Sequence, residues 1–223
     1  MRRWLAGGAV AVVLPFVMST SQLSTATFVV IAAIGAVGLN VLTGYTGQIS
    51  LGHAFFLAAG AYTAAALDGV SAALWLPAAG VVAAACGAVV GPSALRLRGL
   101  YLAIVTIGLV FIGQHILFNS PSLSGGPAGR TFPTLADTGA LRTIGPLTVD
   151  RDGTYYYISL ALLGLALVFV GNLARTRTGR AMQAVRDREA AAAVLGVELA
   201  RTKMSAFVIS SFLGGVAGAL YAS

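Results

Sequence analysis

The sequence predicts an all-α fold: a polytopic transmembrane helix bundle of about seven spans that forms one domain over residues 1–223, with a cytoplasmic N-terminus. Composition gives the first reason, because 57% of the residues are apolar and only 9% are charged, whereas soluble domains carry about 25% charged residues. The second reason is that the apolar residues fall in stretches close to the ~20 residues that a helix needs to cross the ~30 Å hydrocarbon core. The mean hydropathy of +0.87 agrees with both observations.

The apolar stretches follow one another closely, and no polar stretch between them is long enough for a separate soluble domain. The first stretch also resembles a signal peptide, since Arg2 and Arg3 precede it. We favour a retained span, because the next apolar stretch follows at once. The first two stretches need their Ser/Thr-rich flanks to reach across the bilayer. The predicted spans are Trp4–Met18, Phe28–Leu42, Ile49–Leu67, Ala72–Val90, Tyr101–Phe118, Thr154–Leu173 and Ala206–Ala222.

The basic residues fall mainly on one side of this predicted topology. With the N-terminus inside, eleven of the 14 lysine and arginine residues lie in the cytoplasmic segments 1–3, 91–100 and 174–203, as the positive-inside rule requires. Residues 119–153 then form a long external loop. This topology accounts for the net charge of +7, so we expect the chain to contact a lipid bilayer and no nucleic acid.

Small residues are frequent in the predicted spans. Glycines four positions apart let helix backbones approach closely in lipid, and this spacing occurs at Gly87 and Gly91 and again at Gly214 and Gly218. The alternative is that the spacing arises simply because the chain contains 28 glycines.

Glycine and threonine interrupt the apolar pattern in residues 40–53. This charge-free run is a poor continuous helix, and it predicts a tight turn or an unwound segment at or near membrane depth. Irregular backbone is tolerated there only where it is buried in protein or lines a wet cavity. Two alternatives stay open: the lining of a translocation pathway, or a cytoplasmic turn whose polar groups cap helix ends. The residues predicted to border the pathway are Asn40, Gly44, Gly47, Gln48, Ser50 and His53.

The sequence contains no group of residues suited to covalent chemistry. The predicted spans hold no acid of the kind that ion-coupled carriers use, and there is no Cys/His metal cluster. The single lysine, Lys203, does not belong to a P-loop pattern. We therefore predict no catalytic residue, metal or cofactor, and we expect any ATP hydrolysis to take place on a separate polypeptide.

Ten charged residues are concentrated between Arg175 and Lys203. The charges of residues 180–189 are followed by the uncharged and mostly small residues 190–197, and Gly196 fits a helix end in the left-handed conformation. The pattern predicts two short helices, the second with a smooth face that could enter a groove on a partner. The alternative is a basic loop held at anionic lipid headgroups, which leaves the alanine run unexplained.

Four segments resemble one known family. The run Gly179–Gly196 is similar to the coupling loop of ABC-importer permeases, and in particular to that of the branched-chain amino acid permease family. Three further segments occur in the family's order and resemble it too. They are Gly38–Phe56, Leu97–Gly108 and Ser210–Tyr221. Family members usually continue with more spans, so the resemblance also predicts that this chain is a truncated permease.

The resemblance implies a permease subunit of an ATP-driven importer in a bacterial inner membrane, which moves branched-chain amino acids or a related small polar solute by alternating access. It implies two ATPase subunits, a second homologous permease and an extracytoplasmic solute-binding protein as partners. Another amino acid, urea or a short amide stays open as substrate. A stand-alone channel or secondary carrier is the alternative. The residues expected to couple to the ATPase are Gly179, Arg180, Glu189, Ala191, Ala192 and Gly196.

The coupling loop departs from the importer pattern at one position. That pattern has Glu-Ala-Ala, then three residues, then Gly. Counting back from Gly196 places Ala191 and Ala192 on the alanines and Ala190 on the acid, so Glu189 lies one position early.

Overall fold

The computed structural model describes residues 12, 14–16, 18–67, 70–96, 99–126, 130 and 151–223, and all regular elements in this part of the chain are helical. In chain order the elements are η1 (Leu14–Phe16), α2 (Thr20–Thr46), α3 (His53–Ala66), α4 (Ala72–Arg96), α5 (Leu100–Asn119), α6 (Pro121–Ser124), α7 (Arg151–Arg175), α8 (Arg177–Asp187), α9 (Glu189–Val194) and α10 (Leu199–Ala222).

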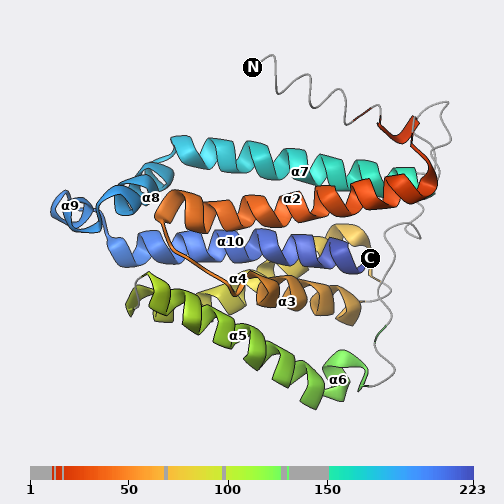
Figure 1. Cartoon of the computed structure of the whole chain (residues 1–223), viewed down its shortest axis with the longest axis horizontal. Helices are drawn as coiled ribbons and strands as arrows, with labels where there is room; N and C mark the ends of the chain where they lie inside the picture. Colours follow the sequence, from red (N-terminus) through yellow and green to blue (C-terminus); the bar gives the residue numbers. More distant parts are fainter. Residues whose placement is uncertain are drawn as a thin grey trace.

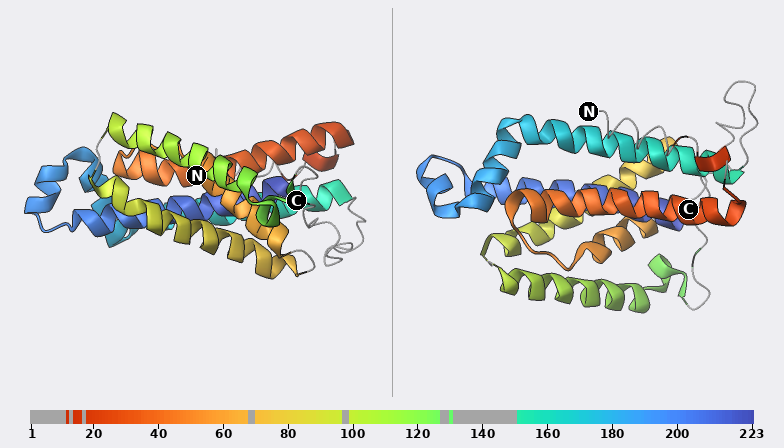
Figure 2. Two further views of the ribbon diagram at one scale, coloured as in Figure 1. Left: turned by 90° about the horizontal axis from the view of Figure 1, so that it is seen from below. Right: turned by 45° about the horizontal axis from the view of Figure 1, so that its top comes forward.

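Helix α10 lies at the centre of the bundle (Figure 1 and Figure 2). It packs against α2, α3 and α4, while α7 lies along α2 and α5 contacts α3. Helices α8 and α9 project from one end, where α4 and α5 are also connected, and α5 ends and α7 begins at the opposite end (Figure 1). This placement agrees with the predicted separation of segments 91–100 and 174–203 from 119–153, although residues 127–129 and 131–150 lie outside the described residues. The end that faces the cytoplasm stays a prediction.

Small residues allow close packing around α10. A Cβ atom at Gly60 of α3 would lie 2.0 Å from the carbonyl oxygen of Gly215 in α10. Because lipid provides no hydrophobic force between helices, such close backbone approach stabilises the bundle through van der Waals contact. The four glycines predicted to pack helices all face a neighbouring helix, which confirms that prediction: they are Gly87, Gly91, Gly214 and Gly218.

Five helices among the described residues are long and apolar enough to cross a membrane, namely α2, α4, α5, α7 and α10. Each contains one predicted span and extends it, as when α2 begins at Thr20 and not at Phe28. The N–H of Ser19 donates to Gln22 Oε1 at 3.1 Å, which satisfies a backbone donor at the start of this helix. The predicted span Trp4–Met18 lies mostly outside the described residues.

The predicted span Ile49–Leu67 is not one continuous helix. Residues 47–52 are non-helical, and α3 has only 14 residues, about 21 Å of helix against the ~30 Å hydrocarbon core. Figure 1 shows the non-helical segment running back from the end of α2 into the bundle, where α3 begins. The expected break in the helix is confirmed for residues 47–52, and its physical reason is the left-handed turn at Gly47, with φ of +68°. The prediction was wrong for residues 40–46, which belong to α2.

Candidate functional site

The loop that carries α8 and α9 (residues 176–197, the α8–α9 loop) begins with a sharp corner at the end of α7. Thr176 caps α8, because its Oγ1 accepts a hydrogen bond from the Gly179 N–H at 3.1 Å. A Cβ atom at the buried Gly179 would lie 2.0 Å from the carbonyl oxygen of Leu173. Arg180 Nη1 donates to the carbonyl oxygen of Arg175 at 2.8 Å. Both predicted residues at this corner therefore hold α8 against α7.

Gly196 closes helix α9, as the sequence predicts. Gly196 has a φ of +83°, its N–H donates to the Ala193 carbonyl, and the Val197 N–H donates to the Ala192 carbonyl, both at 3.0 Å. This pair of bonds is a Schellman motif, which satisfies carbonyl groups that a helix end leaves unpaired. The six-residue helix is thereby closed at a defined point.

The end of the loop exposes small and apolar side chains. Val194 and Leu195 are 88% and 82% exposed, whereas the predicted coupling residue Ala192 is 1% exposed. A bulky residue at position 192 would therefore disturb the chain's own packing. Contiguous exposed apolar side chains mark interaction surfaces. The exposed residues, here called the α9 tip, are Ala190, Ala191, Ala193, Val194 and Leu195.

Glu189 at the start of α9 forms an ion pair with Lys203 of α10. The Lys203 side chain is only 7% exposed, and a buried ammonium group is tolerated when it is paired. The acid that lies one position early in the importer pattern therefore has a partner within its own chain. Sequence reasoning missed this pair, although the single lysine of the chain was an available signal.

Arg186 of α8 contacts the end of α2. Its Nη1 donates to the carbonyl oxygen of Gly44, and its Cγ would lie 3.4 Å from a Cβ atom built on Gly47. Sequence reasoning missed this contact too, because nothing distinguishes Arg186 from the neighbouring arginines along the chain. The contact joins the α8–α9 loop to the segment predicted to border the pathway.

That segment, residues 47–52, lies against α5. The Leu51 N–H donates to Thr106 Oγ1 at 2.9 Å, and a Cβ atom at Gly52 would lie 2.7 Å from the Thr106 carbonyl oxygen. Ser50 is buried, and its Oγ accepts a bond from the Gly52 N–H at 3.3 Å. Thr106, which sequence reasoning did not select, therefore fixes the position of the segment on α5.

Polar atoms are buried without a hydrogen-bond partner near this segment, as far as the described residues go. Gln48 is 6% exposed, and both polar atoms of its amide are unpartnered. His53 Nε2, at the start of α3, and Ser210 Oγ, in α10, are likewise buried without a hydrogen-bond partner. The imidazole of His53 lies between α2 and α10, since its Nε2 is 3.2 Å from a Cβ atom built on Gly214. Each such group costs about 1–3 kcal/mol and requires an explanation.

The remaining predicted pathway residues lie closer to the surface of the bundle. Asn40 is exposed and Gly44 is half-buried, and the Asn40 side chain covers Gly44, where a Cβ atom would be 2.1 Å from Asn40 Oδ1. The structure thus places Gly44 and Gly47 at the end of α2 and Gln48 and Ser50 in the interior.

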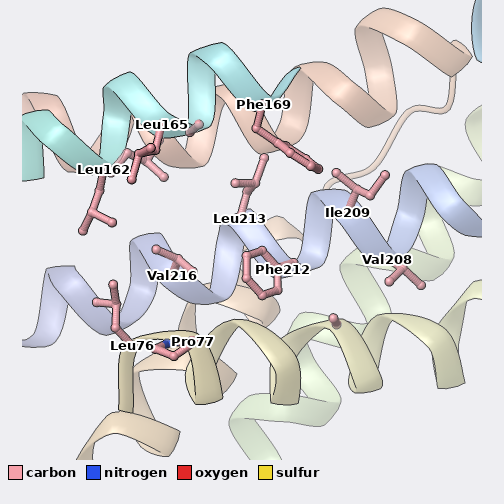
Figure 3. Close-up of a pocket in the computed structure, with 13 residues that line it drawn as sticks. Leu76, Pro77, Leu162, Leu165, Phe169, Val208, Ile209, Phe212, Leu213 and Val216 are labelled. Atoms are coloured by element: carbon pink, nitrogen blue, oxygen red, sulfur yellow. The ribbon is translucent and has the colours of Figure 1, made fainter. Parts of the chain in front are cut away.

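Two apolar hollows lie elsewhere in the bundle. One of about 570 Å³ is bounded by α4, α7 and α10, with Leu76, Phe169 and Phe212 among its lining residues (Figure 3). The other, of about 580 Å³, lies between α3, α4 and α5 and includes Tyr62 and Gln114. No predicted pathway residue lines either hollow. The side chains of the first can give a polar solute no hydrogen bond, so entry there would leave its polar groups unpaired.

Comparison with known proteins gives consistent results. A family model described as the branched-chain amino acid transport system permease component matches residues 21–223. The chain is 37% identical to the high-affinity branched-chain amino acid transport system permease protein LivM of Escherichia coli and 38% identical to LivM of Salmonella typhimurium, over 96% of this chain and 55% of each relative.

A shorter match, 44% identical over 66 residues, is to the autoinducer 2 import system permease protein LsrC of an Enterobacter strain, and covers 30% of this chain and 19% of LsrC. No solved structure matches the chain. The chain spans about half the length of the LivM relatives that it matches. The match over residues 21–223 nevertheless shows that this multi-pass membrane chain belongs to the branched-chain amino acid transport permease family.

Proposed function

We propose that the chain is the permease subunit of an ATP-driven importer that moves branched-chain amino acids, or a related small polar solute, across the bacterial inner membrane by alternating access. Family membership and the LivM relatives support this function. Two ATPase subunits hydrolyse ATP, a second homologous permease completes the pathway, and an extracytoplasmic solute-binding protein delivers the substrate.

The observation that carries the proposal is the α9 tip. It combines small side chains with the exposed Val194 and Leu195, it projects from one end of the bundle (Figure 1) on a loop that contains several arginine residues, and Gly196 ends it sharply. A rigid apolar projection of this size suits a cleft on a soluble partner, because small residues allow close backbone approach there. In an ABC transport system, the soluble partner on which such a cleft is expected is the ATPase subunit.

The orientation of the chain follows from the same proposal. The α8–α9 loop lies in the cytoplasm, since the ATPase is there, and residues 119–153 lie outside. Cysteine labelling with an impermeant reagent at Thr178 and Ser124, in a Cys86→Ala background, checks this. Labelling of position 124 but not 178 in intact cells is expected, and the reverse would contradict the orientation.

The direct test of the function is a bulky substitution on the exposed tip. Ala191→Trp should overfill the partner's cleft at a cost of about 1–3 kcal/mol, which weakens ATPase binding up to about 100-fold. Ala200→Trp is the matched control, because Ala200 is also an exposed alanine but lies outside the tip. The measurements are co-purification of the ATPase and leucine uptake in proteoliposomes.

Two outcomes would overturn the proposal. Unchanged co-purification and uptake in Ala191→Trp would mean that the tip contacts no ATPase. Leucine uptake by the chain without any ATPase would favour a stand-alone channel or secondary carrier.

The pathway is proposed to run past residues 40–53. The polar side chains that border it are Asn40, Gln48, Ser50 and His53. Gly47→Val forces a β-branched residue into positive φ and should misplace this segment. Leucine uptake should fall while the ATPase still co-purifies. Normal uptake by a well-folded Gly47→Val variant would mean that the segment is an ordinary turn.

A further inference from the structure

The end of α2 depends on a side chain from the α8–α9 loop. In a continuing helix the Gln48 N–H would bond to the Gly44 carbonyl. Here the Gln48 N–H donates to the Leu42 carbonyl at 3.2 Å instead, so the Gly44 carbonyl loses its intrahelical partner. Arg186 Nη1 donates to that carbonyl. The guanidinium thereby caps α2 at the point where the helix breaks.

The cap is favoured by charge as well as by hydrogen bonding. The C-terminal end of a helix carries a partial negative charge, which attracts a cation. The Arg186 stem also packs beside Gly47, since its Cγ would lie 3.4 Å from a Cβ atom built there, within van der Waals contact. Position, charge and close packing therefore agree that Arg186 is fitted to this helix end.

The cap connects two parts of the molecule that are 142 residues apart in the chain. On one side, Arg186 belongs to α8, which continues into the α9 tip. On the other side, the capped end leads directly into residues 47–52, which are held on α5 through Thr106. A displacement of the loop would therefore also pull on the end of α2 and on this segment.

The second attachment of the loop goes to a different helix. Glu189 pairs with Lys203 in α10, the most buried of the five candidate spans. Helix α8 packs against α2, α7 and α10. Beyond this packing, the loop makes an ion pair with the central helix and a side-chain hydrogen bond with the end of α2, where the helical hydrogen bonding is already interrupted. Because a smaller share of α2 than of α10 is buried inside the bundle, α2 is the helix of the two that can move with less loss of packing.

We propose that Arg186 is a positioning residue that transmits the movement of the ATPase-bound loop to the pathway segment 47–52 by capping α2 at Gly44. This inference rests on the function proposed above and assigns to one side chain the step between ATP hydrolysis and pathway opening. If the inference is correct, loss of the cap lowers the amount of leucine transported per ATP hydrolysed and leaves ATPase binding intact.

The test uses Arg186→Gln in the complete transporter with its ATPase, reconstituted in proteoliposomes with the binding protein and labelled leucine. Leucine transported per ATP hydrolysed should fall about 5- to 150-fold, the fold-change that typical coupling free energies correspond to, while co-purification of the ATPase stays unchanged. Arg201→Gln is the matched control, because Arg201 is also exposed and forms an ion pair with Glu198 at 3.2 Å on the surface. It should transport normally.

Arg186→Lys provides a rescue that a purely structural effect would not give. A lysine keeps the charge and one donor, so transport per ATP should recover partly, whereas the Gln variant keeps neither the charge nor the reach. If Arg186→Gln accumulates poorly, the comparison of Arg186→Lys with wild type replaces it, and a moderate loss of coupling is then expected.

The outcomes separate this inference from the function on which it rests. Unchanged leucine transport per ATP in Arg186→Gln overturns the inference and leaves the proposed function standing. Loss of ATPase binding in Arg186→Gln also overturns it, since Arg186 would then belong to the docking surface. Failure of the wild-type chain to bind any ATPase removes the proposed function itself.

Discussion

The α8–α9 loop and the segment 47–52 both connect longer helices of the bundle, and they differ in how their polar groups are satisfied. In the loop, Thr176 caps the start of α8 and a Schellman motif at Gly196 closes α9. The buried Lys203 next to it has an ionic partner. The segment 47–52, by contrast, contains Gln48, whose buried amide is unpartnered among the described residues.

This difference indicates different tasks. A connection with its helix ends capped and its buried charge paired keeps one shape, which suits a part that transmits force. Unpaired buried polar groups cost about 1–3 kcal/mol each, and hydrogen bonds to water or to a polar solute would offset that cost. Opening of the segment around Gln48 would therefore allow its unpaired polar groups to form hydrogen bonds, whereas the polar groups described above in the loop already have partners.

The largest expected effect comes from breaking the buried ion pair in the loop. Glu189→Ala leaves the Lys203 ammonium buried without its partner, which should cost about 3–5 kcal/mol in free energy of unfolding, measured in detergent micelles. Glu198→Ala is the matched control, since its pair with Arg201 is exposed and should be worth about 0–1 kcal/mol. Equal losses in the two variants would show that the Glu189 pair does not shape the loop.

The next effect concerns the corner between α7 and α8. Gly179→Ala places a Cβ atom 2.0 Å from a backbone oxygen, and the overpacking should destabilise the chain by about 1–3 kcal/mol and weaken co-purification of the ATPase. Gly171→Ala, on α7, is the control, because nothing lies within 4 Å of its Cβ position. It should be neutral or slightly stabilising. A neutral Gly179→Ala would mean that the corner adapts and that the loop is less rigid than its contacts indicate.

The smallest effect on stability is expected in the segment 47–52, where a substitution should stabilise the chain slightly or leave its stability unchanged. Gln48→Met removes an unpartnered buried amide at similar volume, so the free energy of unfolding should stay constant or rise by up to about 1 kcal/mol. Leucine uptake should nevertheless fall, because a polar point on the pathway is lost. A destabilised Gln48→Met with normal uptake would contradict the assignment of Gln48 to the pathway and would remove the contrast with the loop.

Much of the fold could be predicted because it depends on local sequence. The lengths of the apolar stretches predicted α4, α5, α7 and α10, and the alanine run with its glycine predicted α9 and its end. The helix boundaries were predicted less well. Helix α2 begins at Thr20, in a Ser/Thr-rich stretch that backbone hydrogen bonds hold in the helix, so the apolar pattern did not mark its start.

The parts of the site that could not be predicted depend on contacts between distant segments. The glycines of residues 40–53 indicated a break, but only the folded chain shows that α3 starts inside the bundle and that Arg186 caps α2. Likewise, the alanine run indicated a docking surface, whereas the turn of α9 decides that Ala192 faces inward and that Val194 and Leu195 face outward.

The most direct measurement for the central claim is site-specific photo-crosslinking from the α9 tip in membranes that hold the complete transporter. A photoreactive residue at Leu195 should crosslink to a separate ATPase polypeptide. The same residue at Phe118, which is equally exposed at 82% but lies at the other end of the bundle, should not. Crosslinking of Leu195 to lipid alone, or equal ATPase crosslinking from both positions, would contradict the account.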